Sequence, residues 1–472
     1  MTPLTPPSRL PEPALEALRH RLRGPLLQPD DAGYDRARTV WNAMIDRRPA
    51  LIVQARGAAD VMMAVRFARE QALGIAIRGG GHNVAGHGVC QGGLMLDLSA
   101  MTSIQVDPQR RVARVEPGAL LADLDKETQA HGLATPGGFI SSTGVAGLTL
   151  GGGFGYLSRR WGLTVDNLRE VTLVTAEGEA RRVASDSEPA LFWGLCGGGG
   201  NFGVVTAFEF ALHDLAHPVL AGPVVHDLAD APSVLRRVGE AMREAPDEVA
   251  CLPVLRHAPP KPFIPEAYHG ELILLLALIH SGDPARGEAA LAPLRGIGRP
   301  VGEAVARRPY VDFQSMFDAT ATAGARNYWK GHYLGALEGD AIDVLCDRAR
   351  RMPGQESSIG MLSLGGETAR RPVASTPYPH RQAAWVLNVQ ARWRDPGEDR
   401  AQIAWARETF EAMAPFATGG VYVNFISGDE GESRVHEAYG EAVHARLAAL
   451  KRRWDPQNVF RFNQNIPPSP DR

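Results

Sequence analysis

Runs of consecutive glycines recur in one stretch of the chain, where bare backbone can bind a charged ligand. The first run, Arg78 to Asn83, reads Arg-Gly-Gly-Gly-His-Asn and follows an apolar segment, and two further runs lie within residues 141–155 and 197–205. Unobstructed backbone N–H groups in such loops bind phosphate or pyrophosphate, and the Arg78 side chain would add positive charge. Neither a Walker A loop nor a G-x-G-x-x-G fingerprint opening a helix is present.

The glycines are concentrated around these runs. Of the 51 glycines, 26 lie between Gly74 and Gly203, where an even distribution would place about 14. A single run of this kind often marks only a tight turn. Three runs in one stretch favour one extended ligand that the backbone contacts at several points, and a dinucleotide-sized cofactor fits this description.

His82 directly follows the first glycine run, so its imidazole is placed beside the predicted cofactor loop. A neutral imidazole nitrogen is a nucleophile and can form a covalent bond to a cofactor. The alternative is an ordinary loop histidine that is solvated or hydrogen-bonded. His87 is a weaker candidate for the same role.

Composition and charge exclude several classes of protein. The 50 Lys and Arg residues against 53 Asp and Glu residues give a net charge of −3, which provides no basic surface for nucleic acid or anionic lipid. The four cysteines are far apart and lack metal-ligand spacing, so we expect no metal site and a reducing compartment. The longest apolar segment, 272–279, is too short to span a bilayer, and the first 24 residues lack the apolar core of a signal peptide. We therefore expect a cytoplasmic protein without a membrane partner.

The segments around the glycine runs alternate between strand-like and helical patterns. Residues 58–73 and 120–131 have the apolar spacing of helices. Strands are predicted for residues 51–53, 74–77, 94–96, 111–115, 171–175, 179–184 and 204–210. We expect an N-terminal helical arm at 1–34, in which Leu15, Leu18 and Leu22 share one helix face, and a first domain at 35–216.

After about residue 217 glycine becomes rarer and the apolar segments become longer. Strands are predicted at 272–279, 328–336 and 385–393, and helices at 234–244 and 341–351. This pattern indicates a second domain of α+β type over 217–420. The last segment, 421–472, returns to motifs rich in Gly, Asn and Pro, so we expect it to return to the first domain.

Several longer motifs stand in a fixed order along the chain. They are R-G-G-G-H at 78–82, G-G-G-F-G at 151–155, W-G-L-T-V-D-N at 161–167, G-N-F-G-V-V-T at 200–206, Y-V-N-F at 422–425 and D-P-Q-N-V-F-R-F-N-Q-N-I-P-P at 455–468. Together they closely resemble the berberine bridge enzyme-like flavin oxidases and, within that family, the bacterial branch of 6-hydroxy-D-nicotine oxidase. The resemblance runs from about residue 35 to the end of the sequence.

The resemblance implies an α+β fold with a two-part FAD-binding domain of the p-cresol methylhydroxylase or vanillyl-alcohol oxidase type. This domain would comprise 35–216 and 421–472, with an α+β substrate domain containing an antiparallel sheet at 217–420. In such enzymes the histidine of the R-G-G-G-H loop is bonded to the 8α-methyl group of the flavin, and here that residue is His82. Many relatives add a cysteinyl bond from a position that is Ile140 in this chain, so we expect one covalent attachment.

The predicted FAD contacts combine the glycine runs with the motif positions of the family. They are Arg78, Gly79, Gly80, Gly81, His82, Asn83, Gly86, His87, Pro136, Gly137, Ser142, Thr143, Gly144, Gly147, Gly151, Gly152, Gly153, Gly155, Asp166, Asn167, Gly203, Val204, Val205, Tyr422, Asn424, Asn463 and Gln464.

Two candidate catalytic residues come from the same resemblance. Tyr422 matches a tyrosine at the substrate face of the flavin, and a phenol whose pKa is lowered by positive charge can act as a base. The alternative is a half-buried tyrosine whose hydroxyl is satisfied within the protein. Asn388, five residues before Trp393, stands where plant relatives have a glutamine or an acidic residue. An amide is not a general base, so we expect Asn388 to orient the substrate.

Lys330 is a third candidate, in the run Arg326 to Tyr333 that mixes aromatic and basic side chains. Strand alternation places Tyr328, Lys330 and His332 on one face and the intervening residues on the other. We expect one of these faces to line the substrate cavity, and simple aromatic packing is the alternative.

These observations predict an FAD-dependent oxidase that takes a hydride from a C–H next to oxygen or nitrogen in a small alcohol, sugar or amine. The flavin N5 would accept the hydride, and O2 would be the electron acceptor and yield hydrogen peroxide. Two alternatives are a dehydrogenase or natural-product tailoring enzyme with slow O2 reaction, and a flavin-loaded protein without turnover. The sequence is compatible with a homodimer and leaves the substrate open.

Overall fold

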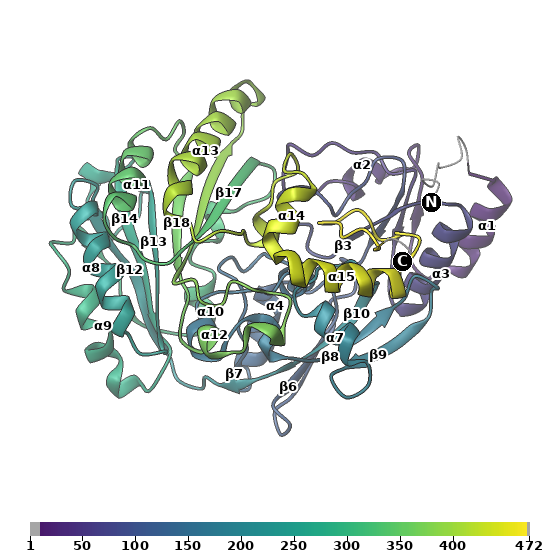
Figure 1. Cartoon of the computed structure of the whole chain (residues 1–472), viewed down its shortest axis with the longest axis horizontal. Coiled ribbons are helices and arrows are strands. Elements are labelled where there is room, and N and C mark those ends of the chain that lie inside the picture. The colour runs from purple at the N-terminus through teal and green to yellow at the C-terminus, as the bar shows by residue number, and fades with distance from the viewer. Residues whose placement is uncertain (1–9, 470–472) are drawn as a thin grey trace.

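The computed structural model describes residues 10–469 and consists of two regions that share one interface (Figure 1). The glycine-loop region, 26–214 together with 421–469, contains three sheets, of four, five and two strands. The large-sheet region, 219–413, contains one sheet of eight strands. In Figure 1 the large-sheet region is on the left and the N-terminal helix on the right.

The four-stranded sheet of the glycine-loop region has the order β1-β2-β4-β3. β2 and β3 run parallel to β4, and α3 covers the crossover between β2 and β3. The elements are α1 (Glu12–Arg21), β1 (Leu26–Leu27), α2 (Tyr34–Ala37), β2 (Leu51–Gln54), α3 (Ala58–Glu70), β3 (Ile75–Arg78) and β4 (Leu94–Asp97). β3 ends at Arg78, so the first glycine run begins at the carboxyl end of a buried parallel strand.

The second sheet of this region is antiparallel, with the order β5-β6-β10-β8-β9. Its strands are β5 (Ile104–Asp107), β6 (Val112–Val115), β8 (Leu168–Val174), β9 (Ala180–Ala184) and β10 (Val204–Ala211). The helices beside it are α4 (Leu121–Gln129), α5 (Val145–Leu150), α6 (Ser158–Trp161) and α7 (Pro189–Leu195), and the short strands β7 (Leu133–Ala134) and β11 (His213–Asp214) pair with each other. The predicted hairpin at 171–184 is confirmed as β8 and β9.

The eight-stranded sheet is antiparallel throughout, with the order β15-β12-β14-β13-β18-β19-β17, and β16 also pairs with β12. Its strands are β12 (Val219–Asp227), β13 (Val249–His257), β14 (Leu272–His280), β15 (Gly302–Glu303), β16 (Ala306–Arg308), β17 (Arg326–Leu334), β18 (Ser358–Ser363) and β19 (Trp385–Trp393). The strand prediction at 385–393 matches β19, whereas β12, β13 and β18 were not predicted.

Four helices cover the outer face of this sheet with an apolar layer. They are α8 (Ala231–Glu244), α9 (Gly287–Arg295), α11 (Asp340–Arg350) and α13 (Asp399–Met413). Shorter helices, α10 (Tyr310–Gln314) and α12 (Glu367–Arg370), contact α4 and α6 of the other region. The inner face of the sheet is thereby turned toward the glycine-loop region.

The last segment of the chain, 421–469, packs on the 26–214 part of the glycine-loop region. α14 (Glu432–Tyr439) and α15 (Glu441–Trp454) follow each other closely, and α15 contacts α7. Beyond α15, Phe462 bridges to Ala76 of β3, and the Ile75 amide donates to the Val459 carbonyl. None of the helices formed by residues 10–469 has the length and hydropathy of a membrane-spanning segment. The α+β class predicted for the chain is confirmed.

Candidate active site

One cavity lies between the glycine loops and the inner face of the large sheet. We call its lining residues from 75–151 and 199–205 the loop wall, and those from β13, β17, β18 and β19 the sheet wall. The C-terminal segment closes the cavity with residues of 422–425 and 460–464. The predicted site residues that line it are Arg78, Gly79, Gly80, Gly81, His82, Asn83, His87, Thr143, Gly144, Gly147, Gly151, Gly203, Val204, Val205, Asn388, Tyr422, Asn424, Asn463 and Gln464.

The loop wall is built by close contact of backbone with backbone. A Cβ at Gly80 would stand 2.6 Å from the Gly144 Cα, and a Cβ at Gly79 would stand 2.7 Å from the Pro117 carbonyl oxygen. These separations are too short for any side chain, so glycine is required here by the meeting of two loops. The first two glycine runs therefore form one continuous surface.

Other positions of the loop wall are open toward the cavity. A Cβ at Gly147 or at Gly200 would meet no atom within 4 Å, and both residues line the cavity. The Asn463 Oδ1 is buried without a hydrogen-bond donor, while its Nδ2 donates to the Gly200 carbonyl. This wall offers a backbone cradle and an unused acceptor, which fits a long polar ligand such as a dinucleotide.

His82 stands in this wall with a free ring nitrogen. Its imidazole stacks on Trp41, with ring centroids 4.3 Å apart, and its Nε2 is buried without a hydrogen-bond partner. Burial lowers the pKa of His82 to about 4, so the ring is neutral at physiological pH. A neutral, oriented imidazole is the state that a nucleophile needs.

Arg78 has a different role from the expected phosphate contact. Its Nε donates to Asp97 at 3.0 Å, and its Nη1 donates to the carbonyls of Ala37 and Thr39, both at 2.8 Å. These contacts use up most of the donors of the guanidinium. Arg78 thus fixes the start of the glycine loop against β4 and residues 37–39, and adds little charge to the cavity.

Nine predicted cofactor contacts lie outside the cavity wall: Gly86, Pro136, Gly137, Ser142, Gly152, Gly153, Gly155, Asp166 and Asn167. In the second run, Gly152 and Gly153 have φ of 112° and 74° and pack against Tyr378 and Thr164. Gly152 and Gly153 therefore serve the turn and its packing, and Gly151 is the residue of this G-G-G run that lines the cavity.

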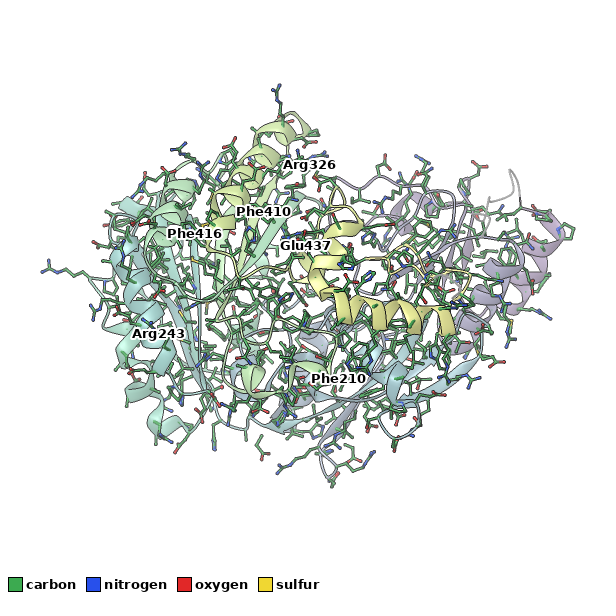
Figure 2. All side chains as sticks on the ribbon, in the orientation of Figure 1. Phe210, Arg243, Arg326, Phe410, Phe416 and Glu437 are labelled. Carbon is green, nitrogen blue, oxygen red and sulfur yellow. The ribbon has the colours of Figure 1, made fainter. Side chains whose placement is uncertain are left out.

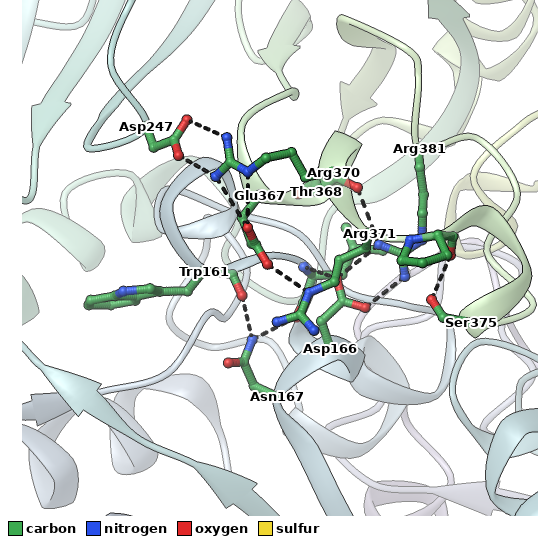
Figure 3. Close-up of polar contacts among 12 residues, drawn as sticks. Trp161, Asp166, Asn167, Asp247, Glu367, Thr368, Arg370, Arg371, Ser375 and Arg381 are labelled. Carbon is green, nitrogen blue, oxygen red and sulfur yellow. Dashed lines mark hydrogen bonds and ion pairs between the residues drawn. The ribbon is translucent and has the colours of Figure 1, made fainter.

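Asp166 and Asn167 take part in a polar cluster between the two regions (Figure 3). Arg381 is fully buried and donates to both carboxylate oxygens of Asp166, at 2.9 and 2.6 Å. Asn167 donates to the carbonyls of Trp161 and Leu163. The W-G-L-T-V-D-N motif therefore joins the regions rather than lining the cavity.

Tyr422 lines the cavity between the two walls. Its phenol oxygen accepts hydrogen bonds from Asn424 Nδ2 at 2.9 Å and from the Gly153 amide at 3.2 Å. Burial raises the pKa of Tyr422 to about 12 despite these two donors. The phenol is therefore protonated at neutral pH, which is opposite to the lowered pKa expected of a base, and its O–H is available to donate.

The sheet wall consists of alternate residues of four strands. β19 contributes Val386, Asn388 and Gln390, and the register pairs Gln390 with Trp329 of β17. Asn388 is 8% exposed and its Oδ1 has no hydrogen-bond partner. An unused acceptor on the cavity wall can bind an O–H or N–H of a ligand.

Lys330 is on the opposite face of β17, which corrects its assignment as a catalytic residue. It pairs with Glu430 at 3.0 Å, and its Nζ lies 5.4 Å from the ring centroid of Phe410, which Figure 2 labels on α13. The sequence left open which of the two faces of β17 lines the cavity, and in the structure it is the face of Trp329.

Three polar residues of the sheet wall, Arg256, Ser358 and Gln390, were not predicted as site residues. The pairing of β13, β18 and β19 brings them together. Arg256 and Gln390 are more than 100 residues apart in the sequence. The alternation that places Asn388 on the wall also places Gln390 there, two residues on, and this signal was available in the sequence.

Comparisons with known proteins identify the family of the chain. A family model for the FAD binding domain matches residues 49–184, and one described as berberine and berberine like matches residues 421–467. The chain is 33% identical over 458 residues to (R)-6-hydroxynicotine oxidase of Paenarthrobacter nicotinovorans, covering 95% of this chain and 97% of that one. It is 32% identical over 434 residues, 91% of each chain, to an FAD-linked oxidoreductase of Dictyostelium discoideum.

The fold matches as well. The crystal structure of 6-hydroxy-D-nicotine oxidase from Arthrobacter nicotinovorans superposes with a TM-score of 0.84 at 30% identity, over 95% of this chain and 98% of that one. With the loop wall, the sheet wall and these relatives in agreement, the chain belongs to the berberine bridge enzyme-like FAD-linked oxidoreductases, in the branch of 6-hydroxy-D-nicotine oxidase.

Proposed function

We propose that this enzyme is an oxidase that removes a hydride from a C–H next to oxygen or nitrogen in a small alcohol, sugar or amine, with O2 reduced to hydrogen peroxide. Bound FAD supplies the hydride acceptor, N5, and the two-electron chemistry with O2. The observation that carries the proposal is the cavity in which the glycine loops of one region face unpartnered polar side chains of the other. The name of the 33% identical relative, (R)-6-hydroxynicotine oxidase, supports the same reaction class.

The loop wall holds the cofactor in this proposal, and His82 is its covalent anchor. Its Nε2 is free and neutral, and Trp41 holds the ring in place. Ile140, at the position of the second, cysteinyl link in many relatives, lines the cavity with a side chain that forms no such bond. One covalent bond, to the 8α-methyl group, is therefore proposed.

The substrate binds between the cofactor and the sheet wall. The Tyr422 hydroxyl donates a hydrogen bond into the cavity, and Asn388 Oδ1 accepts one from the substrate O–H or N–H. None of the cavity-lining side chains described by the structure is a carboxylate. The two residues thus orient the reacting C–H by hydrogen bonds, and neither withdraws a proton at neutral pH.

Acid precipitation of the purified protein tests the covalent anchor. We expect the yellow colour to stay with the precipitated wild-type chain and to move to the supernatant for His82→Ala. His87→Ala is the matched control, because His87 lines the same wall with a pKa that burial and the charge of Arg47 likewise lower to about 4. Colour released from the wild-type chain would refute the covalent bond.

The oxidase assignment is tested by the reaction of the reduced protein with O2. The photoreduced enzyme is mixed with aerated buffer, and the return of flavin absorbance is timed while peroxide is measured. Rapid return with one peroxide per flavin is the expected result. Slow return without peroxide would identify a dehydrogenase instead.

A further inference from the structure

The polar residues of the sheet wall lie in one row across three strands. The register aligns Arg256 of β13 with Ser358 of β18, and Ser358 with Gln390 of β19, and all three line the cavity. The row beside it contains Val254, Gly360 and Asn388. One row is therefore polar in all three strands, whereas the row beside it has a single polar residue, Asn388.

Arg256 carries a charge that the protein does not neutralise. Its Nε donates to the His257 carbonyl at 3.1 Å, and within the described residues no carboxylate forms a salt bridge with it. Burial lowers the pKa of the guanidinium, and no acidic group opposes this effect. The other arginine of the cavity, Arg78, is paired with Asp97. Arg256 is thus the one unpaired cation among the cavity-lining residues of the described chain.

Gln390 presents a second donor beside this charge. The Ser358 hydroxyl donates to Gln390 Oε1 at 3.2 Å, so the Nε2 end of the amide is left for the cavity. In a sheet, Arg256 and Gln390 lie two strand spacings apart, or about 9.6 Å between backbones, which two long side chains can bridge. The Arg256 guanidinium and the Gln390 amide thus both offer hydrogen-bond donors to the cavity from this row of residues.

Asn388, close to Gln390, offers a hydrogen-bond acceptor where Arg256 and Gln390 offer donors. It is two residues from Gln390 on the same strand face, about 6.7 Å along β19, and its unpartnered Oδ1 accepts. A ligand that fits both ends has an anionic acceptor group at the Arg256 row and an O–H or N–H near Asn388.

We propose that the substrate carries a carboxylate in addition to the alcohol or amine that is oxidised, and that Arg256 and Gln390 bind this carboxylate. A hydroxy acid or an amino acid with an apolar body has this chemistry. A neutral substrate would leave the guanidinium desolvated without a partner, which opposes binding. The choice of substrate class rests on the proposed oxidase function, whereas the carboxylate contact itself can be measured without turnover.

Ligand titration of the flavin-loaded enzyme tests the contact. Benzoate and its neutral analogue benzamide are added separately, and the visible flavin spectrum reports binding. We expect benzoate to bind more tightly than benzamide by about tenfold or more. Arg256→Gln should remove this preference, Arg256→Lys should keep part of it, and the surface variant Arg400→Gln should leave it unchanged.

Several results would overturn the proposal. Equal affinity for benzoate and benzamide would do so, as would equal weakening of both by Arg256→Gln. Loss of bound flavin from Arg256→Gln would assign the guanidinium to the cofactor. Binding of phenylphosphonate without binding of benzoate would replace the carboxylate by another oxyanion.

Anaerobic bleaching of the flavin separates this inference from the proposed function. Mandelate is compared with benzyl alcohol, and phenylglycine with benzylamine. Faster bleaching by the acids, lost in Arg256→Gln, supports the inference, and faster bleaching by the neutral compounds counts against it. Benzoate binding that depends on Arg256, with no bleaching by any compound, supports the carboxylate site and counts against the oxidase.

Discussion

The loop wall and the sheet wall face the same cavity, yet they are built in opposite ways. In the loop wall, backbone packs on backbone where the glycine runs meet, as at Gly80 and Gly144, and side chains such as His82 line the rest. In the sheet wall, alternate side chains of paired strands point inward, and Arg256, Gln390 and Asn388 differ in chemistry while their strands stay regular. The first construction suits a ligand that never changes. The second allows the chemistry of the wall to change without a change of fold.

The largest predicted effect lies where the two regions are joined. Arg381→Met removes the partner of Asp166, which is 3% exposed, and leaves a buried carboxylate unpaired. We expect a loss of about 3–5 kcal/mol in the free energy of unfolding, measured by urea titration of the flavin-loaded protein. Arg371→Met is the control, because its ion pair with Glu367 is largely exposed and contributes about 0–1 kcal/mol. Similar losses in both variants would show that the Asp166 pair does not hold the regions together.

The next effect contrasts one glycine from each wall. In Gly80→Ala the new Cβ would stand 2.6 Å from the Gly144 Cα, so two loops must separate, at a cost of about 3 kcal/mol. In Gly360→Ala the new Cβ meets only Leu252 Cδ1, at 3.8 Å, and the strand is undisturbed. We expect the Gly80 variant to lose most of its flavin, measured by the ratio of visible to ultraviolet absorbance, and the Gly360 variant to keep it.

A Gly80 variant that retains its flavin would mean that the loop wall tolerates side chains, and the contrast between the walls would fail. A Gly360 variant that loses its flavin would likewise contradict the contrast, because it would show that the sheet wall does not tolerate an added side chain. Circular dichroism of both proteins distinguishes loss of flavin from loss of the fold.

The loop wall was largely predictable, because its constraints are local. Residues 79–82 follow β3 directly, and a strand followed by glycines and a histidine requires no distant partner to be recognised. The same local view misjudged Gly152 and Gly153. Their positive φ angles turn the chain toward Tyr378 and Thr164, and a glycine motif alone does not tell a cavity contact from a turn.

The sheet wall was hardly predictable, because it depends on pairing between distant strands. β12 and β13 were not predicted, and each contains a proline, a residue that argues against a central strand. Pro223 stands at the gap where β12 changes partner from β16 to β15, and Pro253 precedes the residues of β13 that pair with β18. At both prolines the neighbouring strand on one side does not pair with the residue, so the missing N–H is tolerated. Because β13 was not predicted, the sequence did not indicate that Arg256 lines the cavity.

Asp125 provides the smallest effect, at the contact between the two regions. It lies on α4, which contacts α10 of the large-sheet region, and its Oδ2 is buried without a hydrogen-bond partner. Burial raises the pKa of Asp125 from 3.8 to about 8, so the folded protein holds a proton that the unfolded chain releases near pH 4. The contribution of this group to the free energy of unfolding is therefore greatest below pH 4. It declines as the pH rises toward 8 and is constant above pH 8.

The slope of this decline is on the order of 1 kcal/mol per pH unit between pH 5 and pH 7. We expect Asp125→Asn to remove it, since the amide does not titrate, so that the variant gains stability over the wild type as pH rises. Glu127→Gln, at an exposed position of the same helix, should leave the slope unchanged. Urea midpoints at pH 5, 6 and 7 measure the difference. Parallel pH profiles for wild type and Asp125→Asn would mean that the carboxylate is ionised in the folded protein, and that the contact between α4 and α10 admits enough water to solvate a charge.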